Sequence, residues 1–250
     1  MIGQWHPEVL AGLTALGALY VLRARALTPA LPVGRALAFA AGLVVIAGAL
    51  NGPLHDLADQ YLFSAHMAQH LLLMLVAPPL LLAGLVPGML APLLRRPALA
   101  QALGVMSRPP VAFLLYNAAL VAWHLPVAYG ATLEHHLLHI VQHLTFMATA
   151  VLAWWPVLSP EPHLPRASYP AQLLYLVLLG VPMTAVAAMI TLADHALYPF
   201  YAMAPRIAAL SAVEDQRLGG LLMWVPAGVA PLAAFTAVFF RWAKAEQEPE

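Results

Sequence analysis

Residues 66–74 read HMAQHLLLM and residues 139–147 read HIVQHLTFM, so both stretches follow the pattern H-x-x-Q-H-L-x-x-M. Each residue of the second stretch lies 73 positions after its counterpart, from 66 to 139 and from 74 to 147. Residues four apart share one face of a helix, so each stretch predicts a stripe of two imidazoles and a thioether. Ionisable side chains inside a membrane usually face a bundle interior or a water-filled cavity. The repeat therefore predicts a functional site.

The composition is that of a multi-pass membrane protein. Hydrophobic residues make up 62% of the chain and charged residues only 9%, with eleven basic and eleven acidic side chains. This balance gives no basic surface for nucleic acid, and we expect the lipid bilayer to be the chain's surroundings. The absence of cysteine excludes disulfides and thiolate metal sites on this chain, whereas eleven histidines and ten methionines remain as possible ligands.

Seven transmembrane helices are expected from apolar length and helix-breaking residues, and residues 1–250 are expected to form a single all-α domain. The expected spans cover residues 7–22, 36–51, 64–86, 110–126, 136–158, 170–192 and 216–241. Acidic Glu8 precedes the first apolar run, and Arg23 and Arg25 follow it, which favours a retained span over a cleaved signal.

Basic residues predict the orientation of these spans. Short loops rich in Lys and Arg stay in the cytoplasm, so we expect the amino terminus outside and the carboxyl terminus inside. Only Arg206 and Arg217 then lie on the outer side. The cytoplasmic set comprises Arg23, Arg25, Arg35, Arg95, Arg96, Arg108, Arg166, Arg241 and Lys244. Both histidine stripes then face the outer compartment.

The repeat extends beyond the stripes. Pro53 and Pro126 are also 73 positions apart, which predicts two repeated helical hairpins, spans two with three and spans four with five. Residues 216–218, QRL, echo the QHL of both stripes and suggest spans six and seven as a third hairpin. In that copy Arg217 stands where the others have histidine, among the candidate ligands.

The sharpest interpretation of the stripes is a metal site built from His66, His70, His139 and His143. Imidazole suits copper, zinc and iron, and thioether selects Cu⁺, so the mixture favours copper. All four histidines lie near expected helix amino termini, where the helix dipole keeps the ring neutral for ligation. The nearby acids that could offset the same dipole are Asp56, Asp59, Glu134 and Asp215.

Further residues are candidates for additional ligands or for hydrogen-bond partners of the ligands. Gln69 and Gln142 are expected to fix the orientation of the rings. His124 is either a ligand or a histidine exposed to water at the membrane interface. His6 and His55 are expected in loops. The full candidate set is Met67, Gln69, Met74, His124, His135, His136, Gln142, Met147, Asp194, His195 and Asp215.

Two other interpretations of the same histidines stay open. They could ligate haem between spans three and five, in a haem-binding membrane protein or redox enzyme, or they could be a polar scaffold that binds no metal. The sequence contains no H-E-x-x-H helix, no G-x-S-x-G elbow and no phosphate-binding glycine loop. We therefore expect a protein that is not an enzyme.

Three blocks of sequence carry a resemblance to a known family. They are residues 63–70, FSAHMAQH; residues 139–146 with the WWP of 154–156; and residues 215–224, DQRLGGLLMW. In this order they resemble the CtaG family of bacterial cytochrome c oxidase assembly factors, the seven-span type associated with caa-type oxidases. The resemblance implies a bacterial cell-membrane protein whose partner is an oxidase subunit. It also implies a metallochaperone that delivers copper to that subunit during oxidase assembly.

Overall fold

The computed structural model describes residues 3–28, 30–207 and 209–247, and every regular element in these ranges is helical. The all-α prediction is therefore confirmed. In chain order the elements are α1 (Pro7–Leu27), α2 (Val33–Ala49), α3 (Gly52–Gln60), α4 (Phe63–Leu71), the π-helix η1 (Leu72–Val76), α5 (Ala77–Gly84), α6 (Ala91–Leu94), α7 (Pro97–Met106), α8 (Pro109–His124), α9 (Pro126–Glu134), α10 (His136–Leu158), α11 (Tyr169–Leu179), α12 (Val181–Leu192), α13 (Pro199–Met203) and α14 (Ala212–Ala245).

Several of these helices are long and apolar enough to cross a membrane. The five that qualify directly are Pro7–Leu27, Phe63–Gly84, His136–Leu158, Tyr169–Leu192 and Ala212–Ala245. Two bent pairs qualify when each is taken together, α2 with α3 at 45° and α7 with α8 at 77°. The described residues therefore contain five candidate spans, or up to seven if each bent pair is one span. This is the architecture of a membrane protein.

Short helices fill stretches that the sequence predicted as connections. Proline is at the first or second position of α3, α7, α9 and α13, where Pro53, Pro97, Pro126 and Pro199 lie. A proline at this position needs no hydrogen-bond donor, and its fixed backbone angle suits the first helical turn. These prolines therefore begin short helices rather than loops.

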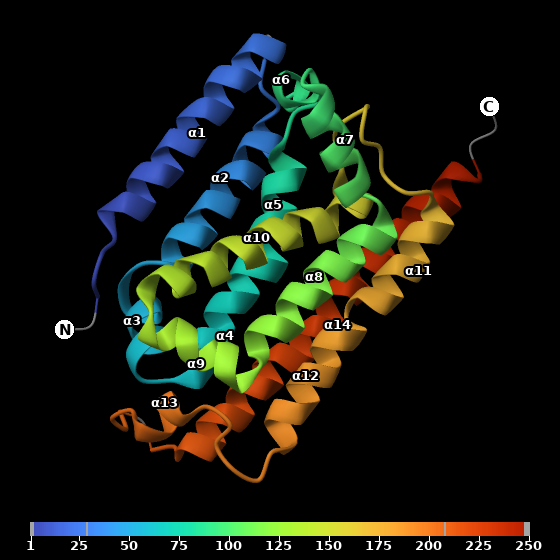
Figure 1. Cartoon of the computed structure of the whole chain (residues 1–250). Coiled ribbons are helices and arrows are strands. Elements are labelled where there is room, and N and C mark those ends of the chain that lie inside the picture. Colours follow the sequence, from blue (N-terminus) through green and yellow to red (C-terminus); the bar gives the residue numbers. More distant parts are fainter. Residues whose placement is uncertain (1–2, 29, 208, 248–250) are drawn as a thin grey trace.

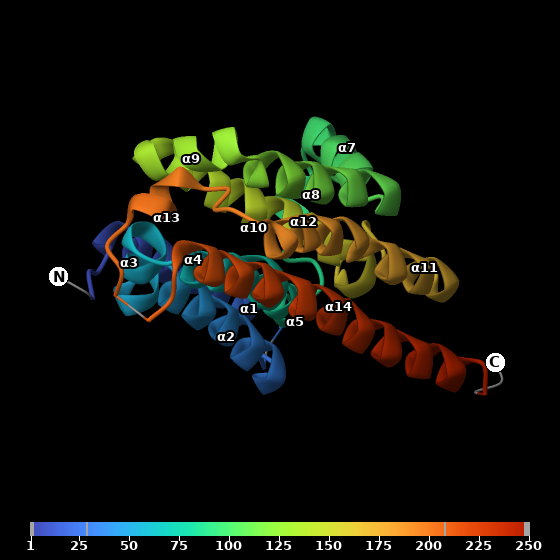
Figure 2. The same ribbon diagram turned by 90° about the horizontal axis from the view of Figure 1, so that it is seen from below.

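The segment α4–η1–α5 lies at the centre of the bundle. It contacts α2 and α3 on one side, α10 on another, and α14 along α4 (Figures 1 and 2). The helices of each predicted hairpin also touch: α2 with α5, α8 with α10, and both α11 and α12 with α14. The two histidine stripes are therefore carried by α4 and α10, and these helices belong to segments in direct contact.

A π-helical turn interrupts the central segment just after the first histidine stripe. Pro78 has no N–H group to donate to the carbonyl of Met74, four residues earlier, so the regular helical ladder is broken there. The indole N–H of Trp154 on α10 donates to that carbonyl at 3.3 Å. The broken turn thus links the two stripe-bearing segments.

The two ends of the bundle differ in chemistry. One end holds α3, α9, α13 and the first turns of α4 and α10 (Figure 1). The opposite end holds α6, α7 and the last turn of α14, and Arg95, Arg96 and Arg241 belong to these elements or follow them directly. The histidine stripes and most of the arginines therefore lie at opposite ends, with Arg206 and Arg217 on the side of the stripes.

Candidate functional site

The four histidines of the two stripes form one cluster. The centroids of the His66 and His70 rings are 4.3 Å apart, as are those of His139 and His143. Between the stripes, the His66 ring is 5.2 Å from His139 and the His70 ring is 5.4 Å from His143. All four side chains are buried, with at most 6% of the residue exposed. The two stripes thus face each other across the α4–α10 interface.

The repeat explains this symmetry. His66 is the fourth residue of α4 and His139 is the fourth residue of α10, so both stripes begin in the first turn of their helices. The next histidine of each stripe lies one turn deeper on the same face. The amino-terminal end of a helix disfavours positive charge on a nearby ring, and burial acts in the same direction. Both effects favour neutral imidazoles, the form that binds metals.

Tyr201 fixes which nitrogen of His66 is available. The Tyr201 hydroxyl donates its single proton to the carbonyl of Ala58 at 2.6 Å, and its oxygen lies 2.7 Å from Nδ1 of His66. His66 must therefore donate from Nδ1, which leaves a lone pair on Nε2. Burial raises the pKa of the Tyr201 phenol, so the phenol keeps its proton. The His66 Nε2 atom is buried and has no hydrogen-bond partner.

His70 is entirely without hydrogen bonds among the described residues. Its Nδ1 and Nε2 atoms are both buried and unpartnered, and the ring packs against Phe146 at a centroid distance of 4.8 Å. Leaving a buried polar group unsatisfied costs about 1–3 kcal/mol. His70 therefore lowers the stability of the folded chain but has a nitrogen lone pair free to bind a metal ion.

His139 and His143 bring two nitrogens close together. Their Nε2 atoms are 3.1 Å apart. Two nitrogens that are each about 2.0 Å from one tetrahedral metal ion are about 3.3 Å apart, so this spacing is close to that of neighbouring ligands. The other nitrogen of His139, Nδ1, lies 3.7 Å from a carboxylate oxygen of Asp59. Each nitrogen of His139 therefore lies close to another potential ligand atom.

The nitrogen atoms converge on two overlapping triads. His66, His70 and His143 each offer one ligand atom within 4.8 Å of the others, and so do Asp59, His66 and His139. All four predicted histidines are thus members of a triad, and His66 belongs to both. Asp59 is the one acid of the four expected near the stripes that joins a triad.

Gln69 has a different partner from the one expected. Its amide nitrogen donates to the carbonyl of Ala49 at 2.8 Å and to Nδ1 of His55 at 2.9 Å, so both amide protons are used. His55 then carries its proton on Nε2, which lies 3.4 Å from Asp59. The prediction of a loop position for His55 was wrong, because His55 lies on α3 behind Asp59. Gln142 is fully buried, and its side-chain nitrogen and oxygen have no partner among the described residues.

His124 extends the cluster on the far side of His70. Its residue is only 6% exposed, and the two ring centroids are 5.9 Å apart. Nδ1 donates to the carbonyl of Leu120 at 2.7 Å, so Nε2 has a free lone pair, buried and without a partner. Because His124 is buried, it is not a water-exposed histidine at the membrane interface, which was one of the two expectations for this residue.

A sequence profile for the cytochrome c oxidase caa3 assembly factor family matches residues 16–245, which is nearly the whole chain. The chain belongs to this assembly factor family. The resemblance inferred from the three sequence blocks is thereby confirmed. The family has a role in the assembly of a caa3-type oxidase, and the histidine cluster of this member lies within the matched residues.

Relatives of this family member come from mycobacteria. An uncharacterized protein of Mycobacterium leprae is 24% identical over 96% of this chain, which aligns with 40% of that protein's length. Uncharacterized proteins of Mycobacterium bovis and Mycobacterium tuberculosis are each 24% identical over 86% of this chain and 35% of their own lengths. The chain thus spans less than half the length of these relatives. No solved structure matches the chain.

Several candidate residues of this family member lie outside the triads. His135, His136, Asp194 and His195 are exposed, and Arg217, expected among the ligands, is exposed as well. Asp215 is fully buried but accepts hydrogen bonds from the backbone N–H groups of Phe63 and Ser64, so it caps α4. Aspartate at the amino-terminal end of a helix is a common capping arrangement.

The three candidate methionines have different surroundings. Met67 is fully buried next to Gly219 of α14, a packing position away from the triads. Met74 is buried within the π-helical turn. Met147 lines a cavity of about 260 Å³ together with His139 and His143. Only Met147 therefore shares a cavity with triad residues.

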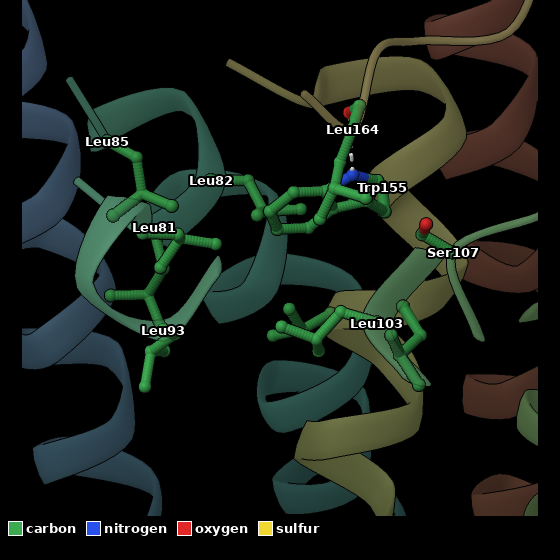
Figure 3. Close-up of a pocket in the computed structure, with 11 residues that line it drawn as sticks. Leu81, Leu82, Leu85, Leu93, Leu103, Ser107, Trp155 and Leu164 are labelled. Atoms are coloured by element: carbon green, nitrogen blue, oxygen red, sulfur yellow. Dashed lines mark hydrogen bonds between the residues drawn. The ribbon is translucent and has the colours of Figure 1, made fainter. Parts of the chain in front are cut away.

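A second cavity lies at the opposite end of the bundle and has a different character. It measures about 280 Å³ and is formed by α5, α6, α7 and α10 with the connecting segments (Figure 3). Leucines dominate its wall, with Trp155 and Ser107 at one side. No titratable side chain lines it, so it is not a candidate metal site.

Proposed function

We propose that this chain is an assembly factor that binds copper as cargo and delivers it to a subunit of cytochrome c oxidase. It would do so at the outer face of the bacterial cell membrane, as a single seven-helix domain that is not an enzyme. Membership of the caa3 assembly factor family supports the oxidase as the partner. The histidine cluster supports copper as the cargo.

Three nitrogen atoms without hydrogen bonds carry the metal hypothesis. They are Nε2 of His66 and both ring nitrogens of His70, all buried. His143 completes a triad with these two residues within 4.8 Å. A buried cluster held together only by hydrogen bonds would use these atoms. Free lone pairs that converge on one point are what a metal ion requires.

The ligand set and the family role together favour copper. The triad supplies neutral imidazole alone, which suits copper, zinc and iron, and the absence of cysteine excludes an iron–sulfur cluster. Copper is also the metal that an oxidase needs for its redox centres, so the family role and the ligand set agree. Monodentate imidazoles allow one ligand to be replaced at a time, as delivery to a partner requires.

The close packing of the rings favours an ion over haem. Tyr129 lies 5.2 Å from His66, and Phe146 lies 4.8 Å from His70, both measured between ring centroids. A porphyrin plane between two axial histidines would need an open slot between α4 and α10. Aromatic side chains occupy the flanks of the cluster instead, and a single ion needs only the space between the nitrogens.

The segregation of charge favours an outer position for the cluster. If each bent helix pair is one span, the chain crosses the membrane seven times, and the arginine-rich end lies in the cytoplasm by the positive-inside rule. The amino terminus is then outside and the carboxyl terminus inside. The first turns of α4 and α10, with their histidines, open toward the outer compartment.

Delivery can be tested in cells that lack this chain. Such cells would be complemented with the wild type or with the His70→Ala/His143→Ala variant, and the copper content of the purified oxidase would be measured. We expect copper-deficient oxidase with the variant, although the variant reaches the membrane in normal amount. Oxidase with full copper in variant cells kept at limiting copper would contradict the proposal.

A further inference from the structure

We infer that the cargo ion occupies two positions in turn, an outer one at Asp59, His66 and His139 and an inner one at His66, His70 and His143. The inference rests on the proposed copper function and adds a route through the site. His66 is the ligand shared by both positions. Asp59 becomes the residue that first captures the ion.

The outer position has the geometry of a binding site. One oxygen of Asp59, Oδ2, lies 3.7 Å from Nδ1 of His139, and the three ligand atoms of this triad are within 4.8 Å of one another. The other oxygen, Oδ1, is buried and has no hydrogen-bond partner among the described residues. A buried carboxylate oxygen without a partner is costly, and a bound cation would satisfy it.

Two contacts position this carboxylate. Gln69 donates to Nδ1 of His55, and Nε2 of His55 lies 3.4 Å from Oδ2 of Asp59. His55 and Asp59 are four residues apart on α3, so they share one helix face. The carboxylate is thus aimed at His139 from a packed helix, and this arrangement limits the reorganisation that binding requires.

A cavity connects the surface to His139 of the outer position. It has a volume of about 260 Å³, and its lining includes His6, Glu8, His55, His136, His139 and Met147. Glu8 and His136 are exposed, whereas His139 is 6% exposed. His143 of the inner position also lines the cavity, whereas Asp59, His66 and His70 do not. The Asp59 side chain is 28% exposed and His70 only 2%, so an ion that arrives from the surface can reach Asp59 before His70.

His66 allows only one ion at a time. Its Nδ1 atom is engaged with Tyr201, so Nε2 is the only nitrogen that it can offer to either position. Movement from the outer to the inner position then replaces Asp59 and His139 with His70 and His143, while His66 stays bound. The exchange breaks and forms metal–ligand bonds only, and the oxidation state of the ion does not change.

The two positions differ in charge and therefore in role. The outer set includes a carboxylate, which attracts a cation from solution and joins imidazole in a mixed N,O set of the kind that suits Cu²⁺. The inner set is neutral and lies deeper in the cluster, where His70 and His66 are at most 2% exposed. Capture and storage are thus assigned to different residues.

The test uses the full-length protein in detergent with Cu²⁺ alone as the probe. Loading is followed by rapid mixing, and the number of bound imidazoles is counted by pulsed electron paramagnetic resonance. For the wild type we expect one copper per chain with three imidazoles. His70→Ala should trap the ion at the outer position with two imidazoles, and His70→Ala/Asp59→Asn should bind none. Asp59→Asn alone should load about tenfold more slowly and still reach three imidazoles.

Asp56→Asn is the matched control, because Asp56 lies on the same short helix and accepts hydrogen bonds from backbone N–H groups near the amino terminus. It should load at the wild-type rate. Asp59→Asn that loads as fast as the wild type, or His70→Ala that binds no copper, would overturn the outer position while leaving the inner site intact. A wild-type protein that binds no copper would instead overturn the proposed function.

Discussion

The hydroxyl oxygen of Tyr201 lies 2.7 Å from Nδ1 of His66, and the same hydroxyl donates to the carbonyl of Ala58. Tyr201 comes from α13, a short helix more than 130 residues away from His66 in the chain. The contact sets the tautomer of the histidine that both triads share. A residue outside the repeat thus determines how the repeat can bind a metal.

Replacing Tyr201 with Phe should therefore weaken copper binding. Loss of the partner frees the His66 ring to rotate and to change tautomer, and such a loss typically lowers metal affinity by about 10- to 100-fold. Competition with a chromophoric copper chelator measures this affinity. Tyr198→Phe is the control, because the buried Tyr198 hydroxyl donates to the backbone carbonyl of His124 and bonds no triad ring. Equal affinities in the two variants would contradict the assigned role of Tyr201.

Gly219→Ala should destabilise the bundle. A Cβ atom at this position would lie 2.5 Å from the Phe63 ring, so α14 would be pushed away from α4. Overpacking of this kind costs about 1–3 kcal/mol. Gly228→Ala on the same helix is the control, since its Cβ would have no neighbour within 4 Å, and we expect unchanged or higher stability. Unfolding in a denaturing detergent, followed by circular dichroism, should separate the two variants.

Asp215→Ala should lower stability without removing a ligand. The carboxylate accepts hydrogen bonds from the backbone N–H groups of Phe63 and Ser64 at 2.8 and 3.2 Å, and these buried donors would lose their partner. The cost is about 3 kcal/mol. The folded fraction should still bind one copper per chain. Lost copper binding at unchanged stability would show that Asp215 is a ligand after all.

The absence of native cysteine makes the orientation directly testable. Single substitutions Asp194→Cys and His163→Cys place a thiol in two exposed connections, one after α12 and one after α10. A membrane-impermeant maleimide added to intact cells should label the Asp194→Cys variant and leave the His163→Cys variant unlabelled. The reverse pattern would place the histidine cluster on the cytoplasmic side.

The sequence predicted the part of the site that repeats. His66, His70, His139 and His143 could be found because helical spacing and a constant offset both mark them, and the structure brings them together. The all-helical fold followed from apolar length in the same way. Periodicity describes one helix at a time, so it identifies the faces of α4 and α10 but not what covers them.

The residues that support the stripes were not predictable in this way. Tyr201 and His55 lie on short helices whose placement against α4 depends on tertiary packing. For His55 the sequence did contain a signal, since His55 and Asp59 have the four-residue spacing of one helix face. His55 was expected in a loop, whereas Pro53 lies at the start of α3 and this helix carries His55.

The most direct test of a metal site at the stripes is the copper content and absorption spectrum of the purified protein. The wild type would be compared with His66→Ala/His143→Ala, which takes a ligand from both triads, and with the control His135→Ala/His195→Ala, which removes two exposed histidines outside the triads. We expect about one copper per chain in the wild type and the control, and none in the first variant. Copper retained in that variant, or a Soret band lost with it, would contradict a copper site at the two histidine stripes.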